Sequence, residues 1–76
     1  MKPATKEELR KLVTATTIDV YEDLAPQAMQ MLKETSNNKN LTAEQLQAEQ
    51  LLNIMAYIKS CTNDIIVEVL AEVLEL

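Results

Sequence analysis

The last thirteen residues of the chain, 64–76, constrain its fold more than any other segment does. Four acids in this segment recur at spacings of four, four and three residues, which places them on one stripe of an α-helix. They are Asp64, Glu68, Glu72 and Glu75. The other residues of the segment are apolar, so a helix here is apolar around most of its circumference and needs to be almost surrounded by protein. The β-branched run 65–67 also suits a strand, but strand alternation would separate Glu75 from Glu68 and Glu72.

The rest of the chain offers little material to surround that helix. Its 76 residues form a single domain, 1–76, and so short a chain has a marginal core. Cys61 is the only cysteine and histidine is absent, so neither an internal disulfide nor a zinc site built from Cys and His can reinforce the fold. We therefore expect tight helix packing supplemented by self-association, with a homodimer as the leading form.

Two helix-start signals are clear in the first two thirds of the chain. Thr5 with Glu8, and Thr42 with Gln45, match the capping box, in which a threonine hydroxyl and the side chain three residues later satisfy free backbone N–H groups. Between these signals, the polar segment 35–41 contains three asparagines and predicts a loop. Because glycine is absent, we expect asparagine to supply any left-handed backbone conformation there.

Pro26 predicts an interruption of the first helical region. Proline has no backbone N–H to donate, and it disfavours the helical conformation of the residue before it. We therefore expect separate helices over 5–24 and 25–35.

The segment 60–64 predicts a second interruption. Its residues, Ser-Cys-Thr-Asn-Asp, prefer helix caps to helix interiors. We favour two helices over 42–60 and 64–75, with one continuous helix as the alternative. The predicted fold class is all-α: a small bundle of three to four helices with an antiparallel hairpin about the 35–41 loop.

The helix expected over 42–60 has two distinct faces. Its apolar face is expected to contact the core and carries Leu51, Ile54, Met55, Ile58 and Cys61. Its polar face is expected to meet solvent and carries Glu44, Gln47, Glu49, Gln50 and Asn53. We interpret Cys61 as a buried structural thiol, because it lies on the apolar line and Lys59 is the only cation close to it in the sequence.

The usual catalytic groups are missing from the sequence. Without histidine there is no Ser-His or Cys-His nucleophile and no imidazole base. Neighbouring carboxylates such as Glu7 and Glu8 fall on faces expected to be solvated. Glu68 and Glu72, one helical turn apart, could chelate a hard cation, but a solvated acidic stripe is the commoner meaning of this spacing. We therefore expect no enzymatic activity, no cofactor, no metal site and no small-molecule substrate.

The formal net charge of −5 restricts the expected partners. An acidic surface disfavours nucleic acids and anionic membranes, and no segment approaches the roughly 18 apolar residues that span a bilayer. Residues 1–11 alone are net basic and carry Lys2, Lys6, Arg10 and Lys11. No apolar run follows these cations, and together with the single cysteine this favours a cytoplasmic location.

The predicted function is a non-enzymatic interaction with another protein, as a small acidic adaptor, inhibitor or co-chaperone. The excess apolar circumference of the last helix locates the expected interface at Ile66, Val69, Leu70, Val73 and Leu74. Two alternatives stay open. One is a regulatory protein that binds nucleic acid through its basic N-terminal helix, and the other is an acidic mimic that occupies a cationic groove of another protein.

Overall fold

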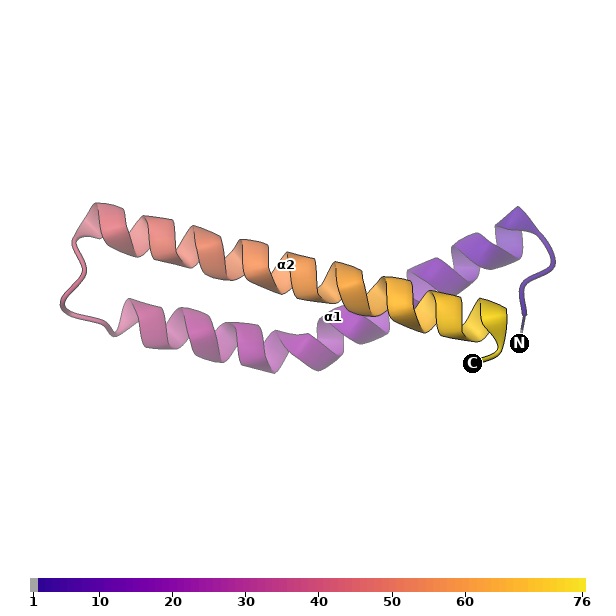
Figure 1. Ribbon diagram of the computed structural model, residues 1–76. Coiled ribbons are helices and arrows are strands. Elements are labelled where there is room, and N and C mark those ends of the chain that lie inside the picture. Colours follow the sequence, from indigo (N-terminus) through magenta and orange to yellow (C-terminus); the bar gives the residue numbers. More distant parts are fainter. Residues whose placement is uncertain (1) are drawn as a thin grey trace.

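The computed structural model describes residues 2–76 and consists of two long helices joined by a short loop (Figure 1). Helix α1 spans Lys6–Ser36 and helix α2 spans Ala43–Leu74. The helices run antiparallel, so both chain termini lie at the same end of the hairpin (Figure 1). The hairpin measures 53 × 17 × 16 Å, and its radius of gyration of 16.5 Å exceeds the roughly 11 Å of a compact chain of this length. The chain is therefore a rod with little interior.

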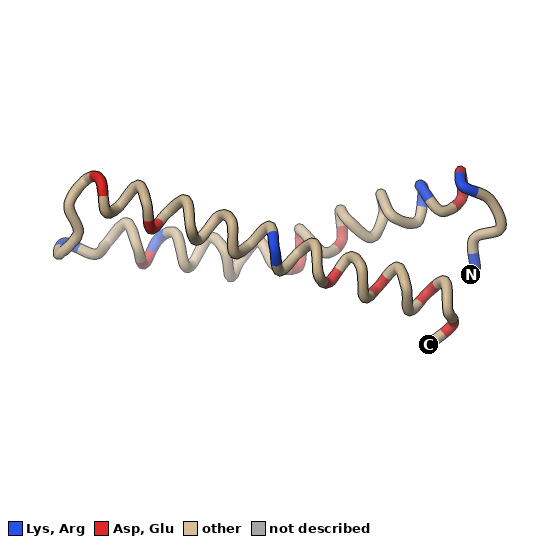
Figure 2. The backbone as a smooth tube through the Cα atoms, turned by 45° about the horizontal axis from the view of Figure 1, so that its top comes forward, with Lys and Arg blue, Asp and Glu red and all other residues tan. Residues whose placement is uncertain are grey.

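The predicted all-α class and the hairpin are confirmed, whereas the predicted bundle of three to four helices is wrong. Helix α1 continues through Pro26. Proline removes one backbone hydrogen bond and its ring crowds the carbonyl of Glu22, and a helix accommodates this by bending. Helix α1 does change direction about midway, so that the two helices cross there and separate toward the termini (Figures 1 and 2).

Helix α2 also continues through the predicted interruption at 60–64. The hydroxyl of Thr62 donates a hydrogen bond to the backbone carbonyl of Ile58 at 2.8 Å, which satisfies the polar side chain inside the helix. The neighbouring Cys61 has no exposed surface, so this turn of α2 is packed inside the hairpin. The local preference of these residues for caps is therefore overridden by packing.

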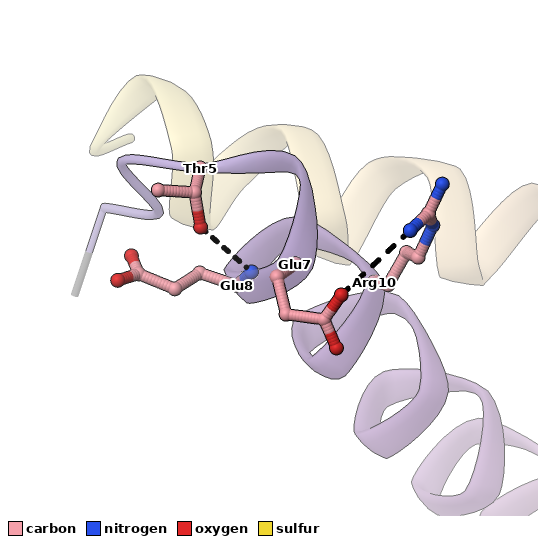
Figure 3. A network of polar contacts seen from close by, with 4 residues as sticks. All are labelled: Thr5, Glu7, Glu8 and Arg10. Carbon is pink, nitrogen blue, oxygen red and sulfur yellow. Dashed lines mark hydrogen bonds and ion pairs between the residues drawn. The ribbon is translucent and has the colours of Figure 1, made fainter.

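Both helices begin at the predicted caps. The Thr5 hydroxyl accepts a hydrogen bond from the backbone N–H of Glu8 at 3.1 Å (Figure 3). The Glu8 carboxylate accepts a hydrogen bond from the N–H of Ala4 at 2.8 Å. Thr42 and Gln45 form a complete capping box, with hydrogen bonds of 3.1 and 3.0 Å.

The loop between the helices is built without a left-handed residue. The N–H of Asn37 donates to the carbonyl of Lys33 at 3.1 Å, and the N–H of Asn40 donates to the Asn38 side chain at 3.0 Å. The expectation of a left-handed asparagine here is wrong. Among the described residues, the left-handed conformation occurs at Glu75, the residue that caps the C-terminus of α2, with φ 58° and ψ 44°.

The contact between the helices is polar near the loop. Three α2 side chains donate hydrogen bonds to α1, and each of these three donors is half-buried. The pairs are Gln50 with the Ser36 hydroxyl (2.7 Å), Asn53 with the Thr35 hydroxyl (2.8 Å) and Tyr57 with the Tyr21 carbonyl (2.7 Å). Gln50 and Asn53 were expected to face solvent, and that expectation is wrong because both are half-buried against α1.

The interior is confined to the middle of the hairpin. Cys61 has no exposed surface, which confirms the prediction of a buried thiol, and Val20 on α1 is 7% exposed. The rings of Tyr21 and Tyr57 pack edge to face, with centroids 5.4 Å apart and an interplanar angle of 84°. In the part of the chain that the structure describes, no other side chain is as buried as Val20 and Cys61.

Most of the large aliphatic side chains are consequently exposed. Four residues expected to contact the core are 43–59% exposed, namely Leu51, Ile54, Met55 and Ile58. The last part of α2, expected to be nearly surrounded, is also open, with 49–62% exposure at Ile66, Val67, Leu70 and Leu74. Two helices alone cannot cover the apolar surface that this sequence carries.

We predict that Cys61→Leu destabilises the hairpin by about 1–3 kcal/mol. Cys61 has no exposed surface, so the larger side chain can be accommodated only by moving the helices apart. Urea unfolding followed by circular dichroism measures the loss. The neighbouring Ser60 is exposed, so Ser60→Leu is the matched control and should leave the free energy of unfolding nearly unchanged. Equal losses in the two variants would contradict tight packing at Cys61.

We also predict that the hairpin loses stability as the pH rises above about 10. Partial burial raises the pKa of Tyr57 above its ordinary value of 10.0, with smaller contributions from Cys61 and Tyr21. Because the pKa of Tyr57 is higher in the folded chain than in the unfolded chain, the neutral phenol contributes to stability. This contribution is complete below the pKa of the unfolded chain and is lost as the pH rises through the pKa of the folded chain. Urea unfolding at about pH 8 and about pH 11 should show a smaller decline for Tyr57→Phe than for the unaltered chain. An identical decline would exclude Tyr57 as its source.

Candidate interaction surface

The separation of the two helices toward the termini opens the surface on which the candidate site lies. Beyond their crossing, the N-terminal half of α1 and the C-terminal half of α2 diverge (Figures 1 and 2). Two grooves line this part of the hairpin, one aliphatic and one acidic.

The aliphatic groove has a volume of about 270 Å³ and lies between α1 and α2. It is lined by Val13, Ile65, Ile66, Val69 and Leu70. None of these side chains carries a polar atom, so the groove offers no hydrogen bond to a ligand and can act only by excluding water from another apolar surface.

The predicted interface residues lie at or beside this groove. Ile66, Val69 and Leu70 line it. Val73 follows Val69 by one helical turn and is half-buried, while Leu74 follows Leu70 by one turn and is 60% exposed. The structure thus brings three of the five residues together and places the other two on the adjoining turn.

Two lining residues were not among the predicted interface residues. Ile65 is half-buried between the helices, and Val13 comes from α1. No signal in the sequence around Val13 marks it, because its place depends on how α1 crosses α2. Ile65 belongs to the same apolar run as Ile66 and could have been included on that ground.

The groove continues into a longer apolar line along α2, which we call the α2 stripe. Its members are spaced by three or four residues and so share one face of the helix. They are Leu51, Met55, Ile58, Thr62, Ile66, Val69 and Val73. Thr62 is the single polar residue among them, and its hydroxyl is bonded to the helix backbone. The α2 stripe extends over 23 residues, from 51 to 73, and its two ends lie roughly 33 Å apart.

The acidic groove has a volume of about 370 Å³ and lies between the same halves of the two helices. Five carboxylates line it, from Asp19 and Asp23 on α1 and from Asp64, Glu68 and Glu72 on α2. The acidic stripe of α2 therefore faces α1 across the groove over three of its four members. Figure 2 shows the acids of α2 following its C-terminal half, whereas the cations of α1 lie near the N-terminus except for Lys33 in its last turn, near the loop. Within residues 2–76 no group of three acidic or cysteine side chains is arranged to hold a metal ion.

Comparison with known protein families, with curated proteins and with solved structures finds no match to this chain. A search of the two described helices for a segment long and apolar enough to cross a membrane also finds none. The functional interpretation therefore depends on the geometry of the hairpin itself.

Proposed function

We propose that this chain is a non-enzymatic protein-interaction protein, of the adaptor, inhibitor or co-chaperone kind. The observation that carries the proposal is the aliphatic groove, together with the α2 stripe that continues it. Large aliphatic side chains that a folded chain leaves half exposed along one helix face are typical of surfaces that bind another protein.

The shape of this surface favours a helix as its occupant. A line of aliphatic side chains roughly 33 Å long is far longer than a small molecule needs, and it is narrow. Amphipathic helices bind such surfaces by laying an apolar face along them, with anchors at spacings of three and four residues. Binding would then come from aliphatic and methionine contacts, since aromatic side chains are absent from the α2 stripe.

The charges beside the surface restrict the partner further. The five carboxylates of the acidic groove lie next to the aliphatic groove on the same diverging halves of the hairpin. They repel a partner that places acids against this groove, and they favour one whose facing surface is neutral or basic. Self-association through the α2 stripe, which carries no charge, belongs to the same proposal. The free thiol of Cys61 is consistent with action in the reducing cytoplasm.

No specific observation favours the two alternatives, which are nucleic-acid binding through the basic N-terminal helix and acidic mimicry in a cationic groove of another protein. In the basic N-terminal segment, Arg10 lies 3.7 Å from the carboxylate of Glu7, an exposed ion pair that weakens the positive field (Figure 3). The five clustered carboxylates line a groove, whereas a mimic of nucleic acid would need to present them on a projecting edge. We therefore retain the interaction protein as the proposal.

We predict that Leu70→Asp abolishes partner binding. A carboxylate in the aliphatic groove would be desolvated by a bound partner without a compensating contact. The test is affinity capture from the native cells, comparing the unaltered chain, Leu70→Asp and Val67→Asp. Val67 is 62% exposed but does not line the groove, so it provides a matched control. Proteins retained by the unaltered chain and by Val67→Asp should be lost with Leu70→Asp, and retention by all three would contradict the proposal.

A further inference from the structure

The apolar residues of the α2 stripe are arranged symmetrically about Thr62. They form pairs at four, seven and eleven residues on either side of it. The pairs are Ile58 with Ile66, Met55 with Val69, and Leu51 with Val73. If a second α2 helix lay antiparallel to the first with a twofold axis at Thr62, every aliphatic residue of the stripe would oppose an aliphatic residue of the other copy.

The absence of charge from the α2 stripe permits this self-pairing. In a twofold dimer the same surface patch of the two copies is in contact, so a stripe with charges of one sign would repel the stripe of the other copy. The charged residues of α2 between 51 and 73 all lie off the stripe. They are Lys59, Asp64, Glu68 and Glu72.

The single chain exposes enough excess surface to supply one side of a stable dimer interface. The accessible surface is 6129 Å², whereas a compact monomer of 8.6 kDa exposes about 4,700 Å². The excess is on the order of 1,400 Å². A stable protein interface buries about 800 Å² on each partner, so covering the stripe and the aliphatic groove would use a large part of the excess.

The distribution of charge favours an antiparallel over a parallel arrangement. Acids gather in the last third of α2 and at its C-cap, at Asp64, Glu68, Glu72 and Glu75, with no cation among them. Parallel pairing would bring the two acidic ends together and align the two helix dipoles, both of which are unfavourable. Antiparallel pairing separates the acidic ends and sets the dipoles in opposition.

We infer that two copies of this chain pair through their α2 stripes, antiparallel and with the twofold axis at Thr62, to form a four-helix assembly. This inference rests on the proposed interaction function and names the occupant of its surface. Ile58 and Met55 of the second copy then lie opposite Ile66 and Val69, and so fill the aliphatic groove beside Val13. The monomer lacks a core of useful size, and the assembly acquires one between its two α2 helices.

The oligomeric state provides the first test. Light scattering behind a sizing column, over a hundredfold range of concentration, should give a mass near twice 8.6 kDa that falls on dilution. Ile66→Lys should give the monomer mass, whereas Val67→Lys should leave the dimer intact. The two residues are adjacent, β-branched and similarly exposed, at 51% and 62%, but only Ile66 lies on the stripe. Circular dichroism confirms that both variants remain helical.

Cross-linking tests the orientation. In a Cys61→Ala background, Leu51→Cys and Val73→Cys chains are mixed and treated with a short bismaleimide. We expect cross-links between the two kinds of chain and none within Leu51→Cys alone, because antiparallel pairing places Leu51 opposite Val73. Thr62→Cys lies at the axis and should cross-link to itself. Cross-linking of Leu51→Cys to itself would overturn the antiparallel arrangement.

The outcomes separate this inference from the proposed function. A monomer mass at every concentration overturns the dimer. If Leu70→Asp still abolishes capture of a different protein, the proposed function stands with that protein as the occupant. If the chain is a monomer and capture is also the same for the unaltered chain, Leu70→Asp and Val67→Asp, then both the dimer and the proposed function are overturned.

Discussion

The hydrogen-bonded contact of α2 with α1 is the constraint on which the rest of the hairpin depends. Gln50, Asn53 and Tyr57 donate to α1, and Cys61 follows them as the most buried of the described residues. These four residues recur at spacings of three and four, so they form one line along α2. A helix has only one such face toward its neighbour. Because polar side chains and a small thiol occupy much of it, most of the large aliphatic residues of α2 lie on other faces, where the single chain leaves them exposed.

The bend of α1 determines where this uncovered surface becomes a groove. Near the loop the helices lie side by side and are joined by hydrogen bonds. Beyond the region of Pro26 they cross and diverge, and α1 no longer covers the flank of α2. Val13 and Ile66 are thereby exposed together in one recess. The same divergence brings carboxylates of both helices around the acidic groove, so one backbone feature generates both surfaces.

The sequence predicts local features of this fold better than it predicts pairing. The caps at Thr5 and Thr42, the loop over 35–41 and the burial of Cys61 are confirmed because each follows from hydrogen bonding or polarity within a few residues. The interruptions at Pro26 and 60–64 are wrong, because helix bending and packing outweigh local preference. The prediction of which face of α2 meets α1 is right only at Cys61. Gln50 and Asn53 face α1 because they bond Ser36 and Thr35, which are far away in the sequence. The candidate interface residues were predicted from the excess of apolar surface on the last helix, whereas Val13 enters the groove only because of how the helices cross.

The proposed binding would couple the stability of this hairpin to the occupancy of its outer face. Burying aliphatic side chains is the main favourable contribution to folding, and here much of that burial is available only on binding. A partner that binds the folded hairpin and not the unfolded chain raises the free energy of unfolding in proportion to the logarithm of its concentration. If the partner is a second copy, stability itself depends on protein concentration. Dissociation then exposes the α2 stripe and weakens the fold in one step, so the surface that binds is also the surface that completes the core.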